Sequence, residues 1–180
     1  MSLASHLGVR VALGTGIALT LLTAVFVLSR AGQPAHAQPS APITITEQAI
    51  TLDAANIMIA AATARAREMG VAVSVVVVDG HGLEKAMVRM DGARVTSANV
   101  AYGKANTAAV RQQTSEAYGQ GLLDNPLLLH SAFAVQPNIF VTPGGLPIIV
   151  DGQVVGAIGS GGGSASEDLQ IATAGLAAIQ

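Results

Sequence analysis

The stretch from Gly144 to Gly163, GGLPIIVDGQVVGAIGSGGG, constrains the fold of this chain more than any other segment. Two apolar, partly β-branched runs flank Asp151-Gly152. Asp-Gly in this position is the strongest short-range sign of a hairpin, because a type I′ turn requires positive φ at both central residues. The stretch therefore predicts two antiparallel strands, Leu146 to Val150 and Gln153 to Ile158, joined by a tight turn.

A glycine-rich segment follows the second predicted strand and leads into a predicted helix. Ser164 and Glu167 have the spacing of a capping box, in which each side chain satisfies a free amide of the first helical turn. Free amides in a glycine loop beside a helix N-terminus favour an anion. We therefore expect an anion site at the amides of Gly159 to Ser164.

The first 37 residues have the features of an export leader. His6 and Arg10 precede an uncharged run from Val11 to Leu28, and Ala35-His36-Ala37 places small residues at the two positions that a signal peptidase reads. We expect cleavage after Ala37 and a periplasmic or secreted mature protein that meets the membrane only through this leader. A retained anchor is the alternative, because a span needs roughly 20 apolar residues.

The expected mature chain of 143 residues has the size of one domain. We expect residues 38–45 to include a linker and residues 46–180 to form the domain. The mature part has eleven Asp and Glu against seven Lys and Arg, a formal net charge of −4, and no basic run. Nucleic acid is therefore not an expected partner. The chain has no cysteine, which excludes disulfides and thiolate chemistry.

Hydrophobic periodicity predicts the remaining elements. They are a helix that starts at the Thr44/Glu47 capping box and ends at Met69, strands at Ala72–Val78 and Leu83–Arg89, and helices at Thr96–Thr114 and Ser164–Ile179. The segment from Glu116 to Gln136 gives no clear pattern, because Pro126 and Pro137 interrupt any long element there.

Several short motifs, in this order and spacing, resemble the family of GlcG-like and HbpS-like haem-binding or haem-degrading domains. They are VVVDGHG (Val76–Gly82), RMDGA (Arg89–Ala93), AYGKANTA (Ala101–Ala108), GGLP (Gly144–Pro147), the Gly152–Gly163 stretch and the ending Ala174-Gly175-Leu176. The resemblance covers the chain from about Ile43 onward.

The resemblance implies a profilin-like α/β domain, with an antiparallel sheet flanked by helices, that assembles as a homo-oligomer. For some family members it also implies capture of extracellular haem, which suits an exported chain, and haem binding or degradation is the function it favours. Intracellular members are tied to glycolate, propanediol or aromatic catabolism. The alternative is therefore an enzyme or accessory protein with a pocket for a small carboxylate. The Asp/Glu-x-x-Glu spacing of surface iron sites is absent, so iron sensing is not expected.

Cationic side chains are candidates for binding a haem propionate or a substrate carboxylate. Arg offers a bidentate fork that matches a carboxylate. The candidates are Arg89 with Asp91 in RMDGA, Lys104 in AYGKANTA, and Arg94 and Arg111, and the backbone of Gly144, Gly145, Gly159, Gly161 and Ser164 completes the predicted site. An Arg89 to Asp91 pair, or a pair of Lys104 with an aspartate, that only stabilises the subunit is equally compatible with the sequence.

The two mature histidines, His81 and His130, are the candidates for ligating haem iron or another metal. A solvent-exposed turn residue is the alternative for His81, and a packed residue in the apolar run Leu127–Phe133 is the alternative for His130. Asp79 with His81, or Asp91 with Lys104, are candidate acid-base pairs. No Gly-x-Ser-x-Gly motif is present, and the sequence leaves open whether the chain is an enzyme.

Overall fold

The computed structural model describes residues 42–136 and 138–180, so the predicted leader lies outside the described residues. Thr46–Gln180 form one compact unit. Across the part of the chain that the structure describes, no helix has both the length and the apolar character that a membrane crossing requires.

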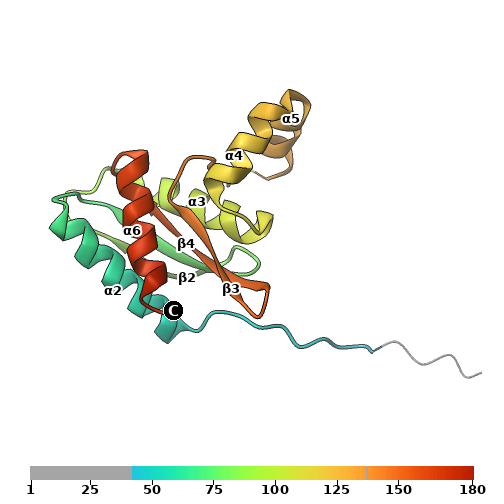
Figure 1. Ribbon diagram of the computed structural model, residues 1–180, viewed down its shortest axis with the longest axis horizontal. Coiled ribbons are helices and arrows are strands. Elements are labelled where there is room, and N and C mark those ends of the chain that lie inside the picture. The colour runs from blue at the N-terminus through green and yellow to red at the C-terminus, as the bar shows by residue number, and fades with distance from the viewer. Residues whose placement is uncertain (1–41, 137) are drawn as a thin grey trace, which may run out of the picture. The chain divides into compact units, whose positions relative to one another are not determined.

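The centre of the compact unit is a four-stranded antiparallel sheet in the order β2-β1-β4-β3 (Figure 1). Its strands are β1 (Ser74–Asp79), β2 (Glu84–Arg89), β3 (Gly145–Val150) and β4 (Gln153–Gly161). Asp151 and Gly152 connect β3 to β4 with φ values of 50° and 78°. Positive φ at both positions confirms the predicted hairpin and its type I′ turn.

Helices cover both faces of this sheet (Figure 1). Helices α2 (Leu52–Glu68) and α6 (Ala165–Ala177) pack with Val75 and Val77 of β1 on one face. Helix α3 (Ser97–Arg111) packs with Val76 and Val78 on the other face. Because successive side chains of a strand point to opposite faces, the valine run of β1 is buried on both sides. This arrangement confirms the α/β class, with an antiparallel sheet flanked by helices.

The segment without a clear sequence pattern forms two short helices, α4 (Ser115–Asp124) and α5 (Pro126–Val135). Pro126 occupies the first turn of α5, where the missing N–H of proline costs no helical hydrogen bond. Leu122, Ala132 and Ile139 form a small separate core under these helices. The two helices stand away from the sheet (Figure 1).

The predicted start of the first helix is wrong, because Thr51 rather than Thr44 caps it. Thr51 Oγ1 accepts a hydrogen bond from the amide of Ala54. The residues before Thr51 are tied to the sheet instead: the Ile50 amide donates to the Val155 carbonyl. The predicted capping box of Ser164 and Glu167 is confirmed at the start of α6.

Candidate functional site

The glycines after the hairpin do not form the open loop that the sequence predicted. Strand β4 continues through Gly161, and Gly159 pairs with Val76 of β1 and Gly145 of β3. A Cβ atom at Gly159 would collide with the Ala101 carbonyl oxygen in α3. Gly159 therefore allows the α3 backbone to approach the sheet. Gly162 and Gly163, which follow β4, line a cavity beside α3.

The chain's own carboxylates accept hydrogen bonds from two amides at the start of α6. The Gly163 amide donates to Asp168 Oδ1 at 3.1 Å, and the Ser164 amide donates to Glu167 Oε2 at 2.7 Å. The hydrogen bonds from the Ser164 backbone and side chain lower the pKa of Glu167. The anion expected at this helix N-terminus is thus supplied from within the chain.

Lys104 and Asp168 form the most buried ion pair of the described residues. Lys104 Nζ lies 2.6 Å from Asp168 Oδ2, and both side chains are almost fully buried. Lys104 comes from α3 and Asp168 from α6, helices on opposite faces of the sheet. A Cβ at Gly144 would lie 2.9 Å from Asp168 Cβ and 3.2 Å from Lys104 Nζ, so the GGLP motif leaves space for this pair at the end of the sheet. Burial lowers the pKa of Lys104, and Asp168 opposes this effect.

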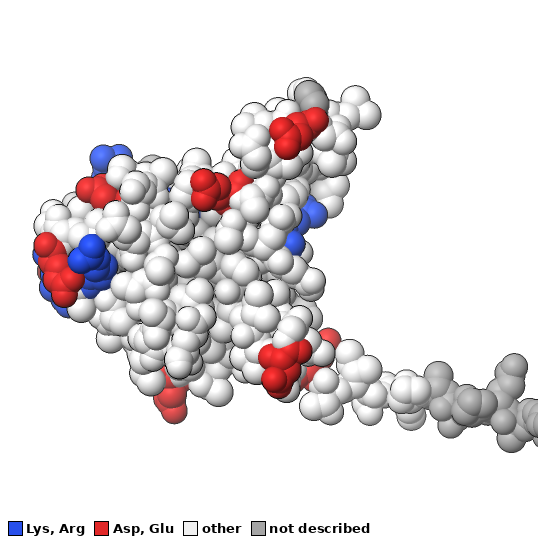
Figure 2. All heavy atoms as spheres, in the orientation of Figure 1, with Lys and Arg blue, Asp and Glu red and all other residues white. Residues whose placement is uncertain are grey.

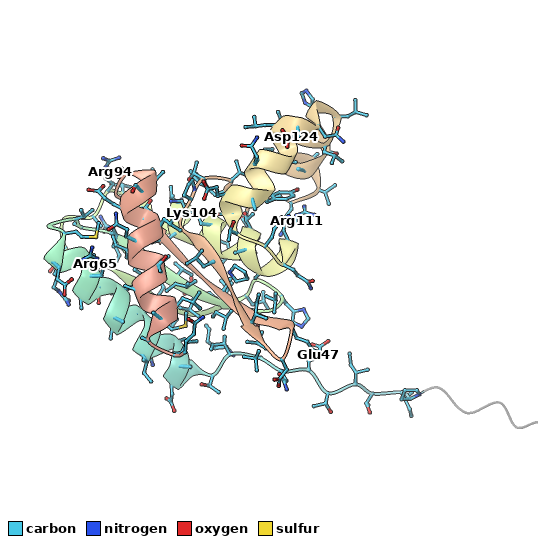
Figure 3. All side chains as sticks on the ribbon, in the orientation of Figure 1. Glu47, Arg65, Arg94, Lys104, Arg111 and Asp124 are labelled. Atoms are coloured by element: carbon cyan, nitrogen blue, oxygen red, sulfur yellow. The ribbon has the colours of Figure 1, made fainter. Side chains whose placement is uncertain are left out.

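The ion pair lines an open cavity of about 270 Å³. Val100 of α3, Phe140 and Thr142 form part of its wall, and Arg94 also lines it. Lys104 Nζ lies 6.0 Å from the centre of the Phe140 ring. Figure 3 shows Arg94 and Lys104 near the N-terminal end of α6. Two cationic side chains and one buried carboxylate therefore meet beside an apolar wall.

A second open cavity, of about 460 Å³, adjoins the first. Both cavities are lined by Thr96, Val100 and Phe140, and the second also has Tyr102 and Ile139 in its wall. We call the two cavities together the α3 groove. Val100, Ile139 and Phe140 give it an apolar wall, Asn99 and Asn138 are polar, and the cations Arg94 and Lys104 lie at one end.

The other predicted cations lie outside the α3 groove. Arg89 is exposed on the edge strand β2, and its guanidinium donates to the Ala93 carbonyl at 2.7 Å. Neither Arg89 nor Asp91 lines either cavity of the groove. Arg111 lies over the Tyr118 ring, 4.8 Å from its centre. Of the predicted pairs, Lys104 with an aspartate does form, but the aspartate is Asp168 and not Asp91.

The histidines are also separate from the α3 groove. His81 Nε2 lies 2.8 Å from Glu47 Oε2, and both side chains are exposed. The hydrogen bond from Glu47 raises the pKa of His81. His130 is exposed on α5. Among the described residues, no group of three or more metal-binding side chains comes together.

Sequence reasoning missed Asp168 and Tyr102 as site residues. Asp168 follows Glu167 in the first turn of α6, where an acidic residue is explained by the helix dipole alone. Lys104 and Asp168 are separated by 64 residues, so no local pattern connects them. Tyr102 lies in the AYGKANTA motif, and its hydroxyl donates to the Gly82 carbonyl at 3.1 Å.

Comparison with known proteins assigns this fold to a family. Residues 50–177 match the family described as haem degrading protein HbpS-like. The chain belongs to the HbpS-like family. It is 37% identical over 127 residues to a 15.0 kDa Citrobacter freundii protein from the dhaT-dhaS intergenic region, an alignment that covers 71% of this chain and 89% of that protein.

Two solved structures support the same assignment. A double mutant of HbpS from Streptomyces reticuli has a TM-score of 0.71 and 31% identity, covering 82% of this chain and 99% of that one. The PduOC:haem complex has a TM-score of 0.68 and 30% identity, covering 73% of this chain and 96% of that one. The family predicted from the sequence motifs is confirmed.

Proposed function

We propose that this chain is an exported haem-binding protein that holds haem in the α3 groove. The carrying observation is the juxtaposition of the groove's apolar wall with the cations Arg94 and Lys104 at one end. Haem has a planar apolar ring, which an apolar wall can contact, and two carboxylates, which cations can bind. Membership in the HbpS-like family and the haem complex of the similar PduOC support the proposal.

The groove residues fit the ring and the propionates of haem better than they fit a histidine-ligated iron. Val100, Ile139 and Phe140 would contact the ring, and Arg94 would bind a propionate through its planar fork. Tyrosine is one of the residue types that ligate haem iron, and among the described residues that line the groove Tyr102 is the residue of such a type. Bound haem would supply a redox-active iron at this place.

Titration with hemin, followed by absorbance, tests this function. We expect a saturable Soret shift with the leader-free protein and a several-fold weaker affinity for Arg94→Ala, because an exposed cation contributes under about 1 kcal/mol. Tyr102→Phe keeps the ring but should change the Soret band.

His81→Ala and His130→Ala should leave the Soret band unchanged, and Arg89→Ala tests the alternative anchor in RMDGA. A protein that gives no saturable shift would contradict haem binding, and a change confined to the histidine variants would contradict the groove.

A second function, binding or converting a small carboxylate, is favoured by the buried Lys104–Asp168 pair. A cavity of about 270 Å³ that contains such a pair suits a molecule much smaller than haem. Calorimetric titration with small hydroxy, oxo and aromatic acids separates the two functions. Binding of such an acid by a protein that gives no Soret shift would favour the second one.

We also propose that the leader is cleaved after Ala37 and that the mature protein is exported. The apolar run and the Ala35-His36-Ala37 site support this proposal. Mass spectrometry of the protein from the periplasm or medium should find Gln38 as the first residue. Intact protein in the membrane fraction would instead indicate a retained anchor.

A further inference from the structure

Lys104 is placed as a buried amine at the wall of a cavity. Its exposed fraction is 1%, yet it lines the cavity of about 270 Å³. An ammonium has three N–H donors. Among the described residues, Nζ makes one hydrogen bond, to Asp168 Oδ2 at 2.6 Å. If the ion pair had only a structural role, the other two N–H groups of this buried ammonium would have no acceptor in the part of the chain that the structure describes. A ligand in the cavity could provide one.

Asp168 is held so that it can exchange a proton with this amine. Its Oδ2 accepts from Lys104, while its Oδ1 accepts from the Gly163 amide at 3.1 Å. The carboxylate is therefore fixed in direct contact with Nζ. Arg94 lines the same cavity and offers a cation to a second charged group of a ligand.

We propose that Lys104 forms an imine with a small 2-oxo acid or aldehyde acid whose carboxylate is bound by Arg94. This inference is independent of haem binding and deepens the second function given above. A small acid fits the cavity of about 270 Å³ beside Nζ, and the Phe140 wall accepts an apolar or aromatic substituent.

The chemistry balances without an oxidant or a reductant. Lys104 transfers a proton to Asp168, and the neutral amine attacks the carbonyl carbon to form a carbon–nitrogen bond. The carbonyl oxygen takes up the two protons released by the nitrogen and by Asp168, and it leaves as water. The product is a protonated imine beside an ionised Asp168. Burial lowers the pKa of Lys104, which favours the neutral amine that the attack requires.

The lysine content of the chain allows a sharp test. Lys85 and Lys104 are its two lysines, and Lys85 is half-buried on β2. The leader-free protein is incubated with glyoxylate and cyanoborohydride, and the reduced adducts are located by peptide mass spectrometry. Because the lowered pKa of Lys104 increases its share of neutral amine, we expect Lys104 to be labelled faster than Lys85 although Lys104 is more buried.

Four variants assign the roles of the residues. Lys85→Arg keeps the site intact and should still be labelled at Lys104, whereas Lys104→Arg keeps a cation beside Asp168 and should lose that adduct. Asp168→Asn removes the acceptor of the Nζ proton and should slow labelling, although it also removes the charge that raises the pKa of Lys104. Arg94→Ala should slow labelling by glyoxylate but not by acetaldehyde, which has no carboxylate.

Labelling of Lys85 at the same rate as Lys104 or faster, or the absence of a Lys104 adduct in folded Lys85→Arg protein, would overturn the proposal. Neither result depends on the outcome of the hemin titration, so haem binding and imine formation can fail separately.

Discussion

Gly159 is a residue whose missing side chain determines how closely two layers of the molecule pack. It lies in β4 against the backbone of α3, where a Cβ would meet the carbonyl of Ala101 and the amide of Ala105. Protein interiors are close-packed, so the helix must shift to admit even one methyl group. The same shift would displace Ala101. Its neighbours Val100 and Tyr102, which line the α3 groove, would move with it.

We expect Gly159→Ala to destabilise the protein by about 1–3 kcal/mol, the usual cost of overpacking a core. Urea unfolding measures this change in the free energy of unfolding. Gly121→Ala is the matched control, because a Cβ at Gly121 in α4 meets nothing within 4 Å. Alanine there should stabilise the helix by roughly 0.5–1 kcal/mol. Equal effects of the two variants would contradict the close approach of α3.

At the scale of elements, the segment before α2 contacts the sheet and the β1–β2 turn. The periodicity of the sequence does not predict these contacts. His81, in the turn between β1 and β2, pairs with Glu47. Ile50 adds a backbone hydrogen bond to β4. Glu47 and Ile50, which the sequence placed in the first turns of the helix, make these two contacts instead.

The His81–Glu47 pair predicts a pH dependence. The folded state raises the pKa of His81 above its ordinary value of 6.5. The stabilisation is therefore complete below the pKa of the unfolded state and is lost as the pH rises through the folded pKa. The urea midpoints of the wild type and Glu47→Gln should differ more at about pH 6 than at about pH 9.

Both side chains are exposed, so we expect a small effect that salt weakens. Glu84→Gln, which changes an exposed glutamate at the start of β2, is the control. A difference between the wild type and Glu47→Gln that is independent of pH would contradict the ion pair.

At the scale of the whole molecule, α5 is a helix with an apolar surface that the described residues leave exposed. Leu127 and Val135 are 85% and 80% exposed. No charged residue occurs between Pro126 and Val150. Figure 2 shows few charged side chains on α4 and α5 in the view drawn. Exposed apolar patches of this kind mark interaction sites.

We expect the mature protein to be a homo-oligomer that buries α5. Leu127 and Val135 are eight residues apart, a spacing that places them in one broad stripe of the helix. Leu127→Glu with Val135→Glu should lower the mass measured by light scattering and leave the circular dichroism unchanged. Ile57→Glu, at an exposed position of α2, is the control and should leave the mass unchanged. A wild type that stays monomeric over a wide concentration range would contradict the expectation.

The sequence by itself determined several of the local elements of this protein. The Asp-Gly turn, the Ser164 capping box and the valine run each depend on neighbours in the chain, and the structure has all three where the sequence predicted them. The family followed from the order of several motifs, each of which is short.

Only the tertiary structure decided which residues meet in the candidate site. Lys104 and Asp168 lie on helices that pack on opposite faces of the sheet. They meet beside Gly144, where a side chain would leave no room for the pair. The same packing placed Gly159 and Gly161 inside β4, where the sequence alone had predicted an anion-binding loop. Turns and caps are set by backbone conformation over a few residues, whereas a buried ion pair depends on how distant elements pack, and no local pattern encodes that packing.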